Sequence, residues 1–138
     1  MDSDEYFAQV RLRPGVIVRA TITLHPVRDD RQVELSMQIE EERFSAIAHD
    51  DFEAFCLVRR QLEARGWLVL CNGSSRNVFP SPMSRDMGGG VMAYVLTIGK
   101  PASMEDVVHI FERTIRIDPV TVDEQQRFYK HWIASLRR

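Results

Sequence analysis

Apolar and polar residues alternate along several stretches of the chain, and this period of two predicts β-strands. One stretch runs from Val16 to Leu24, and a second runs from Gln32 to Glu40 after a polar turn at His25–Asp30. Two such stretches joined by a turn predict an antiparallel hairpin. We expect Arg43–Ala48 to continue the second strand after a kink, and Gln9–Leu12 to form a short extended piece before the first strand.

Helical spacing of apolar residues predicts two capped helices and one shorter helix. The first begins after Asp50 and ends at Gly66, and the last begins after Thr121. Each has a cap residue followed three positions later by glutamate, which resembles a capping box. The short helix is expected over Met104–Phe111. The water-facing side of the first helix is predicted to carry Arg59, Arg60, Glu63 and Arg65.

Two apolar runs, Trp67–Leu70 and Val91–Ile98, are predicted to be strands. Between them lies a stretch with neither a helical nor a strand period, Cys71–Gly90. It holds four of the seven glycines and two of the six prolines. Loops of this length inside a domain are usually functional or disordered. We expect this one to be ordered, because it carries its own apolar anchors. These are Val78, Phe79, Met83 and Met87.

The predicted fold is a single α+β domain over residues 1–138, with one mixed or antiparallel sheet and two to three helices packed mainly on one face. A chain of this length buries enough surface to fold without disulfides or metal ions. The two cysteines, Cys56 and Cys71, are expected to be reduced thiols. The N-terminus is acidic and polar, without the features of a secretory signal, so we predict a cytoplasmic protein with no membrane segment.

The charge of the chain is −2, but it is unevenly distributed. Between Asp29 and Glu53 there are nine acidic and two basic residues, which gives this segment a net charge of −7. One interpretation is that these residues are the solvated faces of a hairpin and a helix start. The other is an acidic surface that steers a basic partner, with its contacts at Glu40, Glu41 and Glu42.

The polar residues of Cys71–Gly90 leave three interpretations open. Arg76 and Arg85, together with Asn72 and several serines, could bind an anion or a small molecule, because guanidinium offers a planar donor fork. The stretch could instead be a structural loop, or a surface for a protein partner in which Met83 and Met87 take part. It has no phosphate-loop ending and no nucleophile elbow, so catalysis is the least supported.

Cofactor, metal and nucleic-acid sites are not expected. The four histidines are scattered and show no metal-ligand spacing. The isoelectric point is near 6.1 and no basic stripe is present, which argues against nucleic acid as a partner.

The core WLVLCNGSSRNVFPSPMSRDMGGGVMAYVLTIGKP, followed by DVVHIF, resembles a widespread set of small uncharacterised bacterial proteins. Such proteins are similar to the immunity proteins of polymorphic toxin, contact-dependent and type VI secretion systems. The resemblance covers Trp67 to Phe111 and carries no catalytic role to any residue. It implies a cytoplasmic inhibitor that binds one cognate toxin domain and performs no chemistry.

Three functional hypotheses therefore remain at this point. The first is an immunity protein whose partner-binding residues are Glu40, Glu41, Glu42, Arg76, Arg85, Met83 and Met87. The second is a small-molecule- or anion-binding domain, with or without enzymatic activity, that uses residues 71–90. The third is an assembly module that forms a homodimer through an exposed sheet face.

Overall fold

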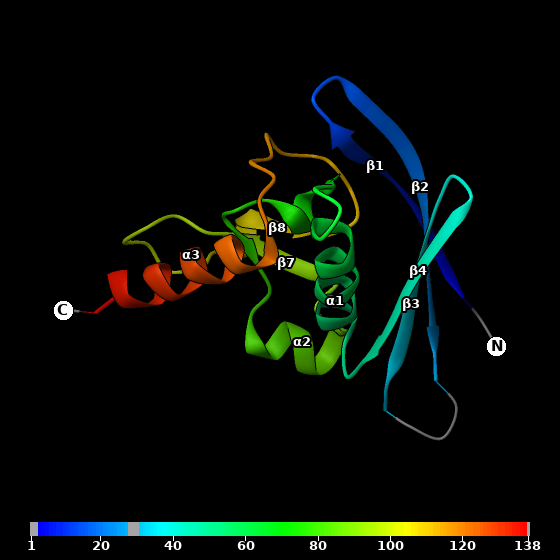
Figure 1. The fold of residues 1–138 in the computed structure, drawn as a ribbon. Helices are drawn as coiled ribbons and strands as arrows, with labels where there is room; N and C mark the ends of the chain where they lie inside the picture. Colours follow the sequence, from blue (N-terminus) through cyan, green and yellow to red (C-terminus); the bar gives the residue numbers. More distant parts are fainter. Residues whose placement is uncertain (1–2, 28–30, 138) are drawn as a thin grey trace.

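The computed structural model describes residues 3–27 and 31–137, and it confirms the α+β class. The strands form two antiparallel sheets, one of five strands and one of three, rather than the single predicted sheet. Figure 1 shows the long strands on one side of the molecule, with α1 between them and the smaller sheet. The helices are α1 (Asp51–Glu63), α2 (Pro82–Gly88) and α3 (Val122–Ser135).

The five-stranded sheet has the order β4-β3-β2-β1-β5. Its strands are β1 (Asp4–Arg13), β2 (Val16–Pro26), β3 (Val33–Ile39), β4 (Glu42–Ala48) and β5 (Leu68–Leu70). The predicted hairpin is confirmed as β2 and β3, in which Ile22 lies opposite Met37. Both side chains are fully buried, because alternate residues of each strand face the core. The predicted turn at His25–Asp30 includes residues 28–30, which lie outside the described residues, as do Asp29 and Asp30 of the acidic segment.

One prediction for the sheet was too short, and another was wrong. The extended piece at Gln9–Leu12 is part of a ten-residue strand, β1, which pairs with β2 along its length. The segment Arg43–Ala48 does not continue β3 but returns beside it, with Ile39 opposite Glu42. The chain reverses at Glu40, whose φ of 54° is the left-handed conformation that tight hairpin turns need. Two glutamates are not the usual residues for such a turn, so the reversal was not apparent in the sequence.

The helix α1 confirms the prediction for its start. Asp50 caps it by accepting a hydrogen bond from the Glu53 amide at 2.6 Å. The helix contacts β3, β4 and β5, and it buries an apolar stripe against them. This stripe includes Phe52, Phe55, Val58 and Leu62. Cys56 and Cys71 are buried free thiols, as expected.

The stretch Cys71–Gly90 is folded rather than open. It contains a 3₁₀ turn, η1 (Asn72–Ser74), the short strand β6 (Val78–Phe79) and the helix α2. The sequence predicted no helix here, because the stretch shows no helical period. Ser81 is instead the N-cap and accepts from the Ser84 amide, and Pro82 takes the first helical position, where its missing N–H is not needed.

The smaller sheet has the order β6-β7-β8, with β7 at Met92–Val95 and β8 at Val107–His109. The strand predicted over Val91–Ile98 is therefore present but shorter. The helix predicted over Met104–Phe111 is wrong: a 3₁₀ turn, η2 (Met104–Asp106), leads directly into β8. Val107 and Val108 pair with β7. This pairing explains why the segment is a strand, because β-branched residues favour β-sheet.

The last helix confirms its predicted start, with a capping box between Thr121 and Glu124. The segment before it, Thr114–Ile117, forms no strand. The helix α3 contacts β6 and α1, and α2 contacts β7. Among the described residues, no helix is long and apolar enough to cross a membrane.

Candidate functional site

The first half of Cys71–Gly90 is buried and satisfies its own polar groups. Asn72 is fully buried, and its amide nitrogen donates to the His109 carbonyl at 3.0 Å and to the Thr114 hydroxyl at 2.9 Å. Its carbonyl oxygen accepts from the Thr114 amide. Both amide protons are donated inside the domain and the side chain is fully buried, so Asn72 has no free donor for a ligand.

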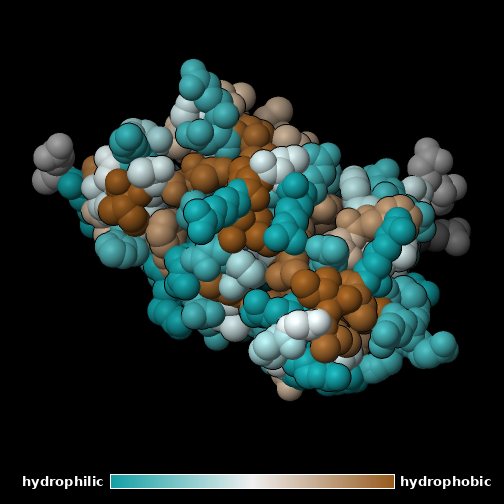
Figure 2. All heavy atoms as spheres, turned by 90° about the horizontal axis from the view of Figure 1, so that it is seen from above, coloured by the Kyte–Doolittle hydropathy of each residue, from teal (hydrophilic) through white to brown (hydrophobic). Residues whose placement is uncertain are grey.

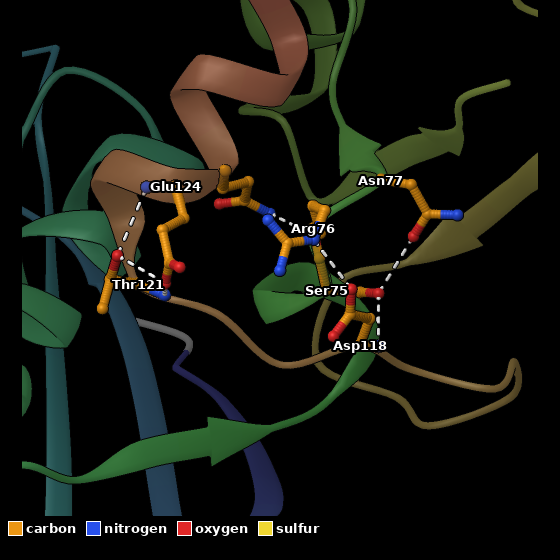
Figure 3. Close-up of polar contacts among 7 residues, drawn as sticks. Ser75, Arg76, Asn77, Asp118, Thr121 and Glu124 are labelled. Carbon is orange, nitrogen blue, oxygen red and sulfur yellow. Dashed lines mark hydrogen bonds and ion pairs between the residues drawn. The ribbon is translucent and has the colours of Figure 1, made fainter. Parts of the chain in front are cut away.

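Arg76 links this half of the stretch to the segment that precedes α3. Its Nε lies 2.8 Å from Oδ2 of Asp118, and this hydrogen bond raises the pKa of the guanidinium. The Asp118 amide in turn donates to the hydroxyl of Ser75 at 2.9 Å. Figure 3 shows these contacts beside the Thr121–Glu124 cap, so Arg76 belongs to a polar cluster that holds two chain segments together.

Arg85 has a different partner, at the N-terminal end of α1. Its Nε lies 2.8 Å from Oδ2 of Asp50, the residue that caps α1, and its guanidinium lies over the Phe52 ring. Arg76, Arg85 and Asn72 thus each engage different partners. The converging anion site that the sequence suggested is not formed.

The structure also contains a buried polar centre that the sequence analysis missed. Arg59 was predicted to face water, yet it is 1% exposed. It donates to the Gln125 side chain at 2.6 Å and to the Val120 carbonyl at 3.0 Å. Its position, four residues after Phe55 and three before Leu62, places it on the buried stripe of α1, and this spacing was the available indication.

The second half of the stretch brings Met83 and Met87 to the surface. These side chains are 70% and 83% exposed, and the helix α2 that carries them buries no residue. They line a groove of about 330 Å³ together with Met92 and Met104. Near its edge, the Tyr94 hydroxyl lies 3.4 Å from the Met104 sulfur. We call this feature the methionine groove; it is lined by Ser81, Met83, Ser84, Met87, Met92, Tyr94, Met104 and Val107.

Sequence reasoning named two of the four methionines of this groove. Met92 and Met104 were missed because they come from β7 and η2, and the true turn at η2 was predicted as a helix. Two exposed acidic residues, Glu105 and Asp106, follow Met104 directly in the chain. A third, Asp86, precedes Met87 but lines a different hollow, with Asp50 and Tyr129. Arg85, on the same helix as Met83 and Met87, is paired with Asp50, and none of the described residues that line the groove itself is charged.

The acidic residues Glu40, Glu41 and Glu42 lie at the β3–β4 hairpin turn. Arg65 donates two hydrogen bonds to the Glu42 carboxylate, at 2.8 and 2.7 Å, and this contact lowers the pKa of Glu42. Glu40 and Glu41 are exposed. Arg65 follows the C-terminal end of α1, whereas Arg85 contacts its N-terminal cap. A helix of 13 residues is roughly 20 Å long, so the acidic turn and the methionine groove are two separate surfaces.

Within residues 3–27 and 31–137, no group of three or more histidine, cysteine, aspartate or glutamate residues is placed to hold a metal ion. His109 packs instead against the rings of Tyr6 and Phe111, and burial lowers its pKa. No protein-family model matches the chain, and a search of curated proteins finds no match to it.

Proposed function

We propose that this protein is a cytoplasmic immunity protein that binds a cognate bacterial toxin domain and neutralises it without catalysis. The observation that supports this proposal best is the methionine groove. Three of its methionines, Met83, Met87 and Met104, are at least 70% exposed although they lie close together. Clustered exposed apolar side chains on a folded domain are typical of a surface that a partner covers.

The chemistry of the groove suits a protein partner. Methionine side chains are flexible and polarizable, so they fit irregular apolar surfaces. An interface needs such an apolar centre with a polar rim, and here Ser81 and Ser84 lie at the groove. The carboxylates of Glu105 and Asp106, which follow Met104 in the chain, favour a toxin segment that combines apolar and basic side chains, and they raise the rate at which it associates.

The groove is a better contact than the acidic turn. Glu42 is already paired with Arg65. The turn consists of glutamates only, so it offers no apolar centre for an interface. Arg76 and Arg85 are paired with Asp118 and Asp50, so we assign structural roles to them and do not place them in the contact surface of the groove.

The test is a pull-down of tagged protein from its native cells, repeated with the double variant Met83→Glu/Met87→Glu. We expect the wild-type protein to retain one stoichiometric partner whose isolated domain stops cell growth, and co-expression of the wild-type protein to restore growth. The double variant should lose both effects, whereas Met83→Leu/Met87→Leu should keep both. Retention of the partner by the double glutamate variant would exclude the groove, and the absence of any toxic partner would exclude the function.

A further inference from the structure

A second surface lies along the first half of β1. The strand β1 pairs with β2 from Asp4 to Arg13, but β5 covers its other edge only at Gln9, Val10 and Arg11. The half from Asp4 to Ala8 therefore has one neighbouring strand in the described structure. The chain that would continue β5 turns away into η1 instead.

This open half leaves backbone groups without a ladder partner. Successive residues of a strand point their N–H and C=O groups to opposite edges, so alternate residues between Asp4 and Ala8 present both groups to the open side. The backbone hydrogen bonds described for these residues all go to β2. The outer edge of β4 differs, because the Gln61 side chain donates to the Ser45 carbonyl there.

A groove of about 770 Å³ lies beside this part of β1 and extends over the strand to Ile17, Val18 and Arg19 of β2. Tyr6 and Phe7 form part of its β1 wall, and Leu70 and Phe111 lie opposite. Phe7 is 50% exposed, with the Arg19 guanidinium 4.0 Å from its ring centroid. Figure 2 shows that apolar side chains reach the surface seen from above in patches separated by polar ones. This groove combines such apolar side chains with unpaired backbone.

We propose that the groove binds an extended segment of a partner polypeptide, which adds to the sheet as a strand beside Asp4–Ala8. A strand is the occupant that supplies donors and acceptors at the two-residue repeat of β1, which neither a helix nor a small molecule does. The five residues Asp4–Ala8 span roughly 17 Å, enough for several ladder hydrogen bonds.

The side chains around the groove indicate the charge and polarity of the partner segment that it binds. Two acidic and two basic residues line it: Glu5, Glu112, Arg19 and Arg113. Their charges balance, so the segment has low net charge and presents apolar side chains to Phe7, Leu70 and Phe111. It thus differs from the basic segment proposed for the methionine groove, and this inference stands independently of the proposed function.

A second copy of this chain fits the edge less well. Tyr6 packs against His109 and Phe111, with ring centroids 5.0 and 4.9 Å away, so the segment containing these residues stands beside β1. If two copies paired through β1, the segment with His109 and Phe111 of each copy would occupy the space beside β1 that the other copy needs.

The probe for this inference is a short peptide of alternating valine and threonine, with a peptide of the same sequence N-methylated at alternate residues as its control. We expect the amide resonances of residues 4–8 and 111–113 to shift on titration, and amides in residues 4–8 to become protected from hydrogen exchange. N-methylation removes backbone donors without changing the side chains, so it should weaken binding about tenfold or more.

Two variants with equally exposed apolar residues complete the test. Phe7→Glu should weaken binding of the peptide about tenfold or more, whereas Ile47→Glu on β4, also at a residue that is 50% exposed, should leave it unchanged. The inference is overturned by no binding at about 1 mM peptide, by equal binding of the N-methylated peptide, or by shifts centred on β4. A dimer held through β1 in the free protein would also overturn it, in favour of a second copy.

Discussion

The Nη1 atom of Arg59 in α1 lies 2.6 Å from the Oε1 atom of Gln125 in α3, and both side chains are 1% exposed. The Gln125 amide nitrogen donates in turn toward the carbonyls of Gly73, Ser75 and Val78, all within 2.9 Å. These two side chains therefore tie both long helices to the first half of Cys71–Gly90. In this way the protein orders a stretch that has no regular period in its sequence.

We predict that Gln125→Leu lowers the free energy of unfolding by about 2–4 kcal/mol. Leucine has a similar size, but it removes the Gln125 hydrogen bonds of the buried Arg59 and of three carbonyls, and Arg59 keeps only its hydrogen bonds to the Val120 and Gly73 carbonyls. Chemical denaturation followed by circular dichroism measures the change. The matched control is Gln126→Leu, because Gln126 is the next residue of α3 and is exposed. Equal stability of the two variants would show that the buried network does not stabilise the fold.

Gly73 lies where η1 packs against the core, and its replacement by alanine is predicted to be costly. An added Cβ would lie 2.6 Å from the Ile110 Cβ and 3.2 Å from the Phe55 ring. Overpacking of this kind costs about 1–3 kcal/mol, so Gly73→Ala should lower the thermal midpoint. Gly88→Ala in α2 is the control, because a Cβ there meets no atom within 4 Å. If Gly73→Ala were as stable as Gly88→Ala, the close packing of η1 would be refuted.

Asp51, in the first turn of α1, predicts a pH dependence of stability. Burial, followed by the nearby carboxylates of Asp50 and Asp4, raises its pKa to about 6 from 3.8. Since the folded protein binds this proton more tightly than the unfolded chain, the contribution of Asp51 to stability decreases as the pH rises from about 4 to about 6. At higher pH the Asp51 carboxylate is ionised in both the folded and the unfolded state, so its unfavourable effect on stability no longer changes with pH.

The variant Asp51→Asn should therefore be more stable than the wild-type protein at pH 8, and this advantage should disappear toward pH 4. Urea denaturation at the two pH values measures it, with the exposed Asp86→Asn as the control for removal of a negative charge. If the advantage of Asp51→Asn persisted unchanged at pH 4, the carboxylate charge would not be its cause.

The strands and helices with strong local patterns were predictable. The alternation in β2 and β3, the Asp50 cap of α1 and the Thr121–Glu124 capping box all appear in the structure where the sequence indicated them. These features depend on contacts between residues that are close in the chain. The resemblance of Trp67–Phe111 to immunity proteins stays a prediction.

The features that were missed depend on distant contacts. The split into two sheets follows from pairing of β8 with β7, and pairing also converted a predicted helix into a strand. The burial of Arg59 depends on Gln125, 66 residues away in the chain. The methionine groove collects residues from α2, β7 and η2, which no local period connects.

The measurement that tests the central claim most directly is the affinity of the captured toxin domain for variants of the two candidate surfaces, by titration calorimetry. We predict that Met83→Glu/Met87→Glu weakens binding at least about a hundredfold. Glu40→Lys/Glu41→Lys should change the affinity less than about threefold, because the acidic turn lies at the other end of α1. Because α2 buries no side chain, the methionine variant should unfold at the wild-type temperature, and so should the charge reversal, because Glu40 and Glu41 are exposed. The opposite order of effects, with the charge reversal abolishing binding and the methionine variant binding normally, would contradict the account.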